Sequence, residues 1–250
     1  MMGDIFEDYE EIVQLREDRA IWLVLDKRCK KVFIKKYRQD FGLDVYESIS
    51  HIQDPHIPKI IKCQEIEGLL CIIEEYIPGE TLQEMMDRDY IFSRNETIKI
   101  MLQLCDALEC LHIRFHPIIH RDIKPSNIVI SSDGILKLID YNAARRYERG
   151  ATQDTRYMGT PGYAAPEQYG FFQSDVRTDI YAMGVVLNYM LTGCHISEET
   201  ASGKLGKIVK KCTRLDPSKR YDSVTDVKRD LQKTTRRQGV FLRYNGNDDV

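Results

Sequence analysis

Apolar residues in the first third of the chain alternate over short runs, with the two-residue period of β-strands. Two such runs around a polar turn predict a β-hairpin over residues 20–37, and two more predict strands over 59–66 and 69–76. Between these pairs, apolar residues recur at helical spacing over 44–53 and stop before Pro55. This part of the chain therefore predicts a small sheet accompanied by one short helix.

The spacing changes after Pro78-Gly79, two residues that interrupt regular structure. Beyond them, apolar residues return every three or four positions in long runs, as in amphipathic helices. Strands followed by helices predict an α+β fold in a single domain, with a small β-rich N-lobe over about 1–77 and a larger helical C-lobe over about 78–250. In the C-lobe we expect helices over 94–113, 177–192, 204–213 and 223–234, short strands within 126–141, and a long loop over 150–170.

The composition is that of an ordinary globular protein and excludes collagen-like, disordered and membrane-spanning classes. The 250 residues are 42% hydrophobic and 30% charged, and 36 basic against 39 acidic side chains leave a net charge of -3. A chain without excess positive charge offers no general attraction for nucleic acid, so no nucleic-acid partner is expected. No apolar run approaches the roughly 18 residues of a membrane span. Residues 1–9 are acidic and lack the apolar segment of a signal peptide.

Seven cysteines are scattered along the chain without a C-x-x-C pair, which argues against a zinc cage. Most of them lie inside apolar runs, which is typical of buried thiols. Reduced thiols belong to a reducing compartment, so we expect a cytoplasmic location.

The chemically richest segment is His120-Arg121-Asp122-Ile123-Lys124-Pro125-Ser126-Asn127. It is followed by Asp140 at the end of an apolar run and then by Ala165-Pro166-Glu167. These strings, in this order, resemble the signature of the eukaryotic-like (Hanks-type) serine/threonine protein kinases, particularly those of bacteria. The resemblance extends from about Tyr9 to Leu231 and implies the bilobal protein-kinase fold. It also implies phosphoryl transfer from ATP to serine or threonine hydroxyls of protein substrates, and we expect autophosphorylation as well.

The resemblance assigns roles to the catalytic segment. Asp122 is expected to accept and orient the substrate hydroxyl, and Lys124 to lie beside the transferred phosphoryl group. Asn127 and Asp140 are expected to bind Mg²⁺, a hard cation that prefers oxygen ligands. The alternative is that these side chains merely cap a turn, and four matched positions argue against it.

Other positions follow from the same resemblance. Lys35 is expected to bind the ATP phosphates, and Thr160 to contact Asp122. Residues expected to line the adenine pocket or its rear are Glu74, Glu75 and Ile77. Arg121 is expected to bind phosphate on the loop that contains Thr152 and Thr155, the candidate phosphorylation sites, which are equally explained as plain polar loop residues. Structural roles are implied for an ion pair of Glu167 with Arg220 and for Asp179, which would hold the catalytic backbone.

The chain departs from the family pattern in its N-lobe. The glycine-rich phosphate loop is missing from 15–22, where Glu17 and Asp18 stand. Phe33 occupies the position usually taken by a small alanine over the adenine, and Val45 the position of the helix glutamate that pairs with the strand lysine. We therefore expect Glu74 to replace that glutamate as the partner of Lys35, with Glu47 as the alternative.

These departures keep a second class of function open. A pseudokinase with the same fold would act as a regulatory binding or scaffolding module, and the missing glycine loop favours that reading. The complete set of catalytic residues in the C-lobe favours the enzyme. A kinase of small molecules is a third reading, opposed by the resemblance of 159–167 to the peptide-positioning loop of protein kinases. The sequence leaves the substrate and the oligomeric state undefined.

Overall fold

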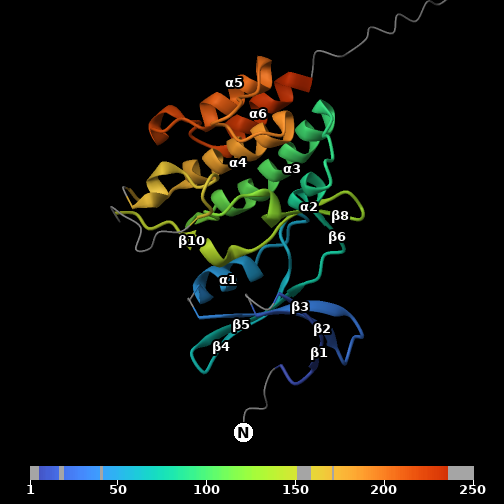
Figure 1. The fold of residues 1–250 in the computed structure, drawn as a ribbon. Coiled ribbons are helices and arrows are strands. Elements are labelled where there is room, and N and C mark those ends of the chain that lie inside the picture. Colours follow the sequence, from blue (N-terminus) through green and yellow to red (C-terminus); the bar gives the residue numbers. More distant parts are fainter. Residues whose placement is uncertain (1–5, 17–19, 40–41, 151–158, 171, 236–250) are drawn as a thin grey trace, which may run out of the picture.

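The computed structural model describes residues 6–16, 20–39, 42–150, 159–170 and 172–235. Figure 1 shows a twisted sheet at one end of the molecule and a group of helices at the other, with a single helix, α1, between them. The expected α+β architecture with a β-rich and a helical lobe is thereby confirmed.

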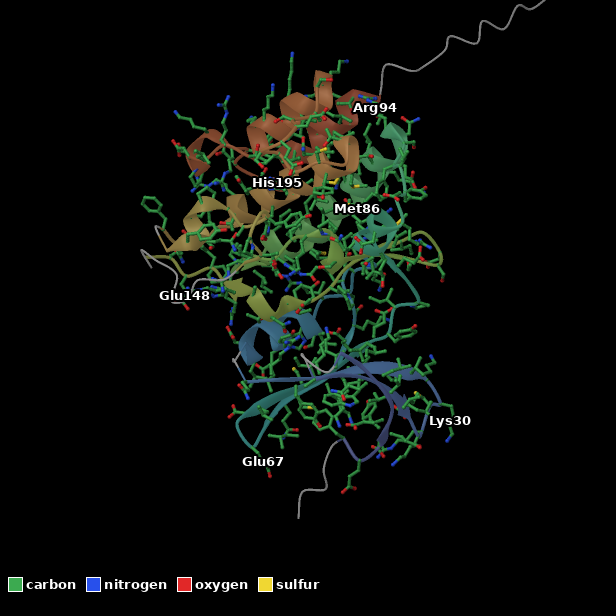
Figure 2. All side chains as sticks on the ribbon, in the orientation of Figure 1. Lys30, Glu67, Met86, Arg94, Glu148 and His195 are labelled. Atoms are coloured by element: carbon green, nitrogen blue, oxygen red, sulfur yellow. The ribbon has the colours of Figure 1, made fainter. Side chains whose placement is uncertain are left out.

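The first lobe is a five-stranded antiparallel sheet with the strand order β1-β2-β3-β5-β4. Two of its hairpin turns contain Lys30 and Glu67, which lie toward opposite ends of the sheet in Figure 2. Both turn residues adopt positive φ, at 56° and 51°. The strands are β1 (Tyr9–Arg16), β2 (Ile21–Asp26), β3 (Val32–Arg38), β4 (Ile60–Ile66) and β5 (Leu69–Glu75).

The two faces of this sheet are covered differently. On the inner face, Leu70 and Ile72 of β5 join the main core together with Tyr46 and Ile49 of α1 (Leu43–Ser50). On the outer face, a second cluster is formed by Phe6, Tyr9, Val24, Cys71 and Ile73. Because strand side chains alternate between faces, a shift of one residue along β3 moves a side chain from one environment to the other.

The second lobe is built on long helices, all four of which the sequence predicts. These are α3 (Arg94–His112), α4 (Val176–Thr192), α5 (Gly203–Cys212) and α6 (Val224–Thr235). Helix α3 begins with a capping box in which Ser93 accepts from the backbone N–H of Glu96 and Glu96 accepts from that of Ser93. Its buried face, including Leu104 and Leu108, is fully enclosed in the core.

Short elements between the lobes and helices carry most of the chemistry. Strand β5 leads through 76–78 into β6 (Gly79–Thr81) and α2 (Leu82–Asp87). After α3 come β7 (Ile118–Ile119), a 3₁₀ turn (Pro125–Asn127), β8 (Ile128–Ser131), β9 (Leu136–Leu138), a second 3₁₀ turn (Tyr141–Ala143), β10 (Arg145–Arg146) and a third 3₁₀ turn (Pro166–Tyr169). The last of these lies in the segment expected to be a loop.

The sequence did not predict β1, β6, α2, β7 and β10. Strand β1 is an edge strand whose residues Ile12, Val13 and Leu15 are about half exposed, so it shows no clear buried face. The other four elements have two to six residues each, which is too short for a periodic signal.

Candidate active site

The catalytic segment follows β7 and is fastened to the helical lobe by Asp179, in the first turn of α4. The Asp179 carboxylate is completely buried and accepts hydrogen bonds from the backbone N–H of His120 (2.9 Å) and of Arg121 (2.8 Å). His112 Nε2 lies 2.8 Å from the same carboxylate. Burial alone would raise the pKa of Asp179, but these hydrogen bonds outweigh burial and hold the pKa below its usual value. Asp179 therefore holds the backbone of the catalytic segment, as expected.

Asp122 lies at the centre of a cluster of polar side chains. Thr160 Oγ1 donates to Asp122 Oδ1 at 2.7 Å, and Lys124 Nζ lies 2.8 Å from Asp122 Oδ2. Lys124 also donates to Thr160 Oγ1 at 2.7 Å. Asn127 Nδ2 donates to Asp122 Oδ2 at 3.0 Å and to its backbone oxygen at 2.8 Å. The structure thus brings together the four residues that the sequence singles out as catalytic, from segments 38 positions apart.

The environment of Asp122 keeps its carboxyl ionised. Partial burial would raise its pKa, but the hydrogen bonds from Lys124 and Thr160 and the charge of Lys124 outweigh it and lower the pKa. An ionised carboxylate can accept the hydrogen bond of an approaching hydroxyl group. Lys124 and Thr160 therefore fix both the orientation and the charge of the proposed base.

His120 supports the same segment as a neutral imidazole. Its Nε2 lies 3.2 Å from the backbone oxygen of Ile139, while the backbone N–H of Asp122 donates to Nδ1 at 3.4 Å. One ring nitrogen thus donates and the other accepts, which is the pattern of the uncharged ring. Complete burial lowers the pKa of His120, in agreement with this pattern.

Asn127 and Asp140 offer oxygen atoms suited to a hard cation. Because Asn127 directs its amide hydrogens to Asp122, its amide oxygen points away from that residue. Asp140 follows β9 with φ at 66°, accepts from Asn142, and lies 3.8 Å from Arg38 Nη2. A carboxylate and a carboxamide oxygen are the ligand types that Mg²⁺ takes beside substrate phosphates. The residues present therefore fit the metal, and their binding role stays a prediction.

The two neighbouring lysines of β3 lie on opposite faces of the sheet. Lys36 stands opposite Ile72 on the inner face and forms a buried ion pair with Glu74. Lys35 stands opposite Ile73 on the outer face, and its Nζ lies 3.0 Å from Glu11 Oε1. The expected pairing of Lys35 with Glu74 is therefore wrong by one residue, since Glu74 does pair with a lysine of β3, but with Lys36.

The helix between the lobes supplies no acidic partner for either lysine. Val45 is buried, as expected for a residue facing the sheet, and Glu47 is exposed to solvent. The alternative partner, Glu47, is thus also ruled out by its position. The lysine on the inner face is paired within the sheet, by a residue of β5.

The position of Phe33 corrects a second expectation. Its ring packs edge-on against Tyr9 on the outer face, with ring centroids 6.0 Å apart. Phe33 therefore cannot narrow a nucleotide pocket on the inner face. Ile34, the next residue of β3, stands opposite Glu74 and lies on the inner face together with Lys36.

The segment expected to meet adenine connects β5 to β6. Glu75 Oε2 accepts from Lys137 Nζ at 2.9 Å and from the backbone N–H of Lys59 at 3.0 Å, so its carboxylate braces the lobes. Ile77 is partly exposed. The adenine-binding roles of Glu75 and Ile77 stay predictions.

The ion pair that braces the helical lobe is present. Arg220 donates to both carboxylate oxygens of Glu167, at 2.6 and 2.8 Å, and both side chains are buried. Thr178 adds a hydrogen bond to the same carboxylate at 2.9 Å. A bidentate, fully hydrogen-bonded pair of this kind fixes the end of the 159–170 segment against α4.

Some expectations lie outside the described residues. These are the phosphorylation candidates Thr152 and Thr155 and the loop acids Glu17 and Asp18. Arg121, expected to bind loop phosphate, donates through Nε to the backbone oxygen of Ala143 at 2.6 Å. Its phosphate-binding role stays a prediction.

Two residues of the site were missed from the sequence. The family motif places its lysine at Lys35, so Lys36 was not identified as a site residue. Side chains alternate between the two faces of a strand, so only one of the two lysines can share a face with Glu74. Gln168 follows Glu167 directly and carries no motif signal of its own, yet its buried side chain contacts the catalytic segment.

Comparison with known proteins agrees with this geometry. The family model described as "Protein kinase domain" matches residues 14–235. Among curated proteins, the chain is 26% identical to a probable serine/threonine-protein kinase of Clostridium perfringens, over 100% of this chain and 42% of that protein. It is 29% identical to the serine/threonine-protein kinase PrkC of Bacillus subtilis, over 89% of this chain and 37% of that protein.

A third relative is the probable serine/threonine-protein kinase PknB of Lactococcus lactis, 29% identical over 81% of this chain and 36% of that protein. The chain thus spans about two fifths of the length of the curated relatives it matches. Among the residues that the structure describes, no helix is both long and apolar enough to cross a membrane.

Proposed function

Because the chain belongs to the protein-kinase family, we propose that it transfers the γ-phosphoryl group of ATP to serine or threonine hydroxyls of protein substrates. The single observation that supports this most is the arrangement of Lys124, Thr160 and Asn127 around the ionised carboxylate of Asp122. The named relatives carry the names of serine/threonine-protein kinases, and none of these comparisons supports the pseudokinase alternative.

In the proposed reaction, the substrate hydroxyl oxygen attacks the γ-phosphorus and the bond to the β-phosphate oxygen breaks, which releases ADP. Asp122 accepts the hydrogen bond of the hydroxyl, orients its oxygen for attack and takes up its proton as the new O–P bond forms. Lys124 lies beside the transferred group and offsets its negative charge. Thr160 orients Asp122 by donating a hydrogen bond to its other carboxylate oxygen, Oδ1.

Mg²⁺, when bound with the nucleotide, neutralises phosphate charge. Asn127 and Asp140 would hold it through their side-chain oxygens. For the phosphates themselves, Lys36 on the inner face is a better candidate than Lys35, which faces away from α1 and pairs with Glu11. The rear of the pocket would be formed by Glu74 and its edge by Glu75 and Ile77.

The proposal also includes the boundary between the two lobes and the location of the protein in the cell. We divide the single domain near Ile77, where the last strand of the five-stranded sheet has ended and β6 has not begun. We also propose a cytoplasmic location, because most of the seven cysteines lie inside apolar runs, as is typical of reduced, buried thiols.

The test is a turnover assay with labelled ATP, Mg²⁺ and a general protein substrate, including the chain itself as acceptor. Asp122→Asn should abolish transfer while Mg·ATP affinity and thermal stability stay close to those of the unchanged protein. Asp133→Asn, at an exposed turn, is the matched control and should retain full turnover. Near-normal transfer by Asp122→Asn would overturn the assignment of the base.

A further inference from the structure

The side chain of Gln168 bridges two segments of the site that are far apart in sequence. It lies in the 3₁₀ turn Pro166–Tyr169 and is only 3% exposed. Its Nε2 donates to the backbone oxygen of Arg121 at 2.7 Å, and its Oε1 accepts from the backbone N–H of Ala165 at 2.9 Å. Both ends of the amide are therefore used, one on each segment.

The carbonyl that Gln168 binds belongs to the peptide unit directly before Asp122. Arg121 adopts φ at 64°, a left-handed conformation that non-glycine residues rarely take and that needs support from its surroundings. Asp179 binds the N–H of Arg121 at 2.8 Å, and Gln168 binds its carbonyl oxygen. The two contacts together fix the backbone from which the Asp122 side chain projects.

The same amide packs against the start of the segment that carries Thr160. A Cβ added to Gly159 would lie 2.7 Å from Gln168 Nε2 and 2.8 Å from Ala164 Cβ. Gly159 also adopts φ at 132°. The next residue, Thr160, donates to Asp122 at 2.7 Å. Gln168 thus contacts both the backbone before Asp122 and the backbone before its threonine partner.

We propose that Gln168 is a positioning residue that couples the 159–165 segment to the catalytic carboxylate of Asp122. The inference rests on the proposed phosphoryl transfer, in which Asp122 must meet the substrate hydroxyl at a fixed angle. Gln168 touches neither reactant in this role. Through its hydrogen bond to the Arg121 oxygen, Gln168 orients the peptide unit before Asp122. Because Gln168 also contacts the 159–165 segment, that orientation depends on the position of this segment.

The first test is Gln168→Glu, which keeps the size and the acceptor for Ala165 but replaces the donor that faces the oxygen of Arg121. Since small misplacements of catalytic groups cost up to about 100-fold, kcat should fall roughly 10- to 100-fold. The KM for ATP should change less than about twofold, because the nucleotide contacts are elsewhere.

Gln103 provides a matched control. Its Nε2 donates to the backbone oxygen of Gly134 at 3.4 Å and its Oε1 accepts from the backbone N–H of Leu136 at 2.9 Å, so Gln103→Glu disturbs the same kind of bridge away from the catalytic segment. Both variants are assayed below their melting temperatures. A kcat loss in Gln168→Glu no greater than in Gln103→Glu would overturn the proposal.

The pH profile separates positioning from simple loss of packing. A protonated glutamic acid can again donate to the Arg121 oxygen, and burial favours the protonated form. The kcat of Gln168→Glu relative to the unchanged protein should therefore rise several-fold between pH 8 and pH 6. A flat ratio across this range would contradict the donor role.

Hydrogen exchange gives a readout that does not depend on activity. Gln168→Glu should speed exchange of the amides in 120–127, and Gln103→Glu should not. Gly159→Ala, which displaces the Gln168 amide, should reproduce the effect, whereas Gly134→Ala, with φ at 80° and nothing within 4 Å of an added Cβ, should not. Unchanged exchange in 120–127 would overturn the coupling. Absence of turnover in the unchanged protein would instead overturn the proposed function.

Discussion

The carboxylate of Glu74 on β5 pairs with the ammonium group of Lys36 on β3, and each side chain is only 6% exposed. The two strands are hydrogen-bonded neighbours, with Lys36 opposite Ile72 and Ile34 opposite Glu74. The pair is therefore diagonal across one face of the sheet. Because no acidic residue of α1 faces this pair, the position of Lys36 depends on the sheet and not on the helix.

The two adjacent lysines should respond differently to substitution. Lys36→Met should reduce both kcat and ATP affinity, with kcat/KM falling about 100-fold or more, because it removes the lysine that lies on the inner face. Lys35→Met removes a pair on the outer face, in which the Lys35 side chain is 9% and the Glu11 side chain 46% exposed, and should change kcat/KM by less than about threefold. Steady-state kinetics with ATP as the varied substrate measures both. A larger loss of kcat/KM in Lys35→Met than in Lys36→Met would assign phosphate binding to Lys35 instead.

Removing one member of the buried pair should destabilise the fold. Glu74→Leu leaves Lys36 buried without its partner, and such a change costs about 3–5 kcal/mol of unfolding free energy. Adding Lys36→Leu should recover much of that loss, because two apolar side chains can replace a buried pair at little cost. Denaturant unfolding of the single and double variants measures the coupling.

The control for this cycle is the combination of Glu74→Leu with Lys35→Leu. Lys35 lies on the other face of the sheet, so the two effects on unfolding free energy should add to within about 0.5 kcal/mol. Additive effects in the Lys36 cycle would show that Glu74 and Lys36 act independently.

The metal assignment predicts a difference between nucleotide binding with and without Mg²⁺. Asp140→Asn removes a charged oxygen ligand, so the affinity for Mg·ATP should fall at least tenfold, whereas binding of ATP in the presence of a chelator should change little. Calorimetric titration in both conditions gives the comparison. Equal losses would mean that Asp140 acts through its contacts with Arg38 and Asn142 and not through a metal.

His120 should make stability depend on pH. Its pKa is lowered in the folded protein, so between its folded pKa and the ordinary value of about 6.5 the unfolded chain binds the proton more readily. The contribution of His120 to the free energy of unfolding is therefore complete above about pH 6.5. It declines as the pH falls below that value, with a slope of at most about 1.4 kcal/mol per pH unit. Unfolding at pH 7.5, 6.5 and 5.5 should show a shallower decline for His120→Phe. His51→Phe, at an exposed position, should keep the slope of the unchanged protein, and equal slopes in all three proteins would contradict the assignment.

The sequence predicted the helices and the catalytic segment well, for different physical reasons. Long helices such as α3 and α4 bury one face over several turns, which leaves a clear period in the sequence. The segment from His120 to Asn127 is recognisable because its chemistry requires fixed residue types at fixed spacing. Both signals are local.

The errors in the first lobe arise from strand geometry. Lys35 and Lys36 differ by one position, and one position along a strand reverses the face on which a side chain lies. Both lysines are buried, so only the face of the sheet separates them, and the motif match carries no information about that face. The same one-residue step explains the error for Phe33. The partner of Lys36 lies on a different strand, so no spacing within β3 could identify it.

The outer cluster has a practical consequence for where the folded unit begins. Phe6 and Tyr9 are 3% and 7% exposed and close this cluster together with Val24, although the family match starts only at residue 14. A protein trimmed to the matched residues would lose both aromatic rings and leave Cys71 and Ile73 open to solvent. Burial of one large apolar side chain contributes about 1.5–3 kcal/mol, so the two missing rings would remove a substantial part of the stability of a small sheet. The minimal stable fragment for crystallisation or assay therefore has to include Phe6 and Tyr9.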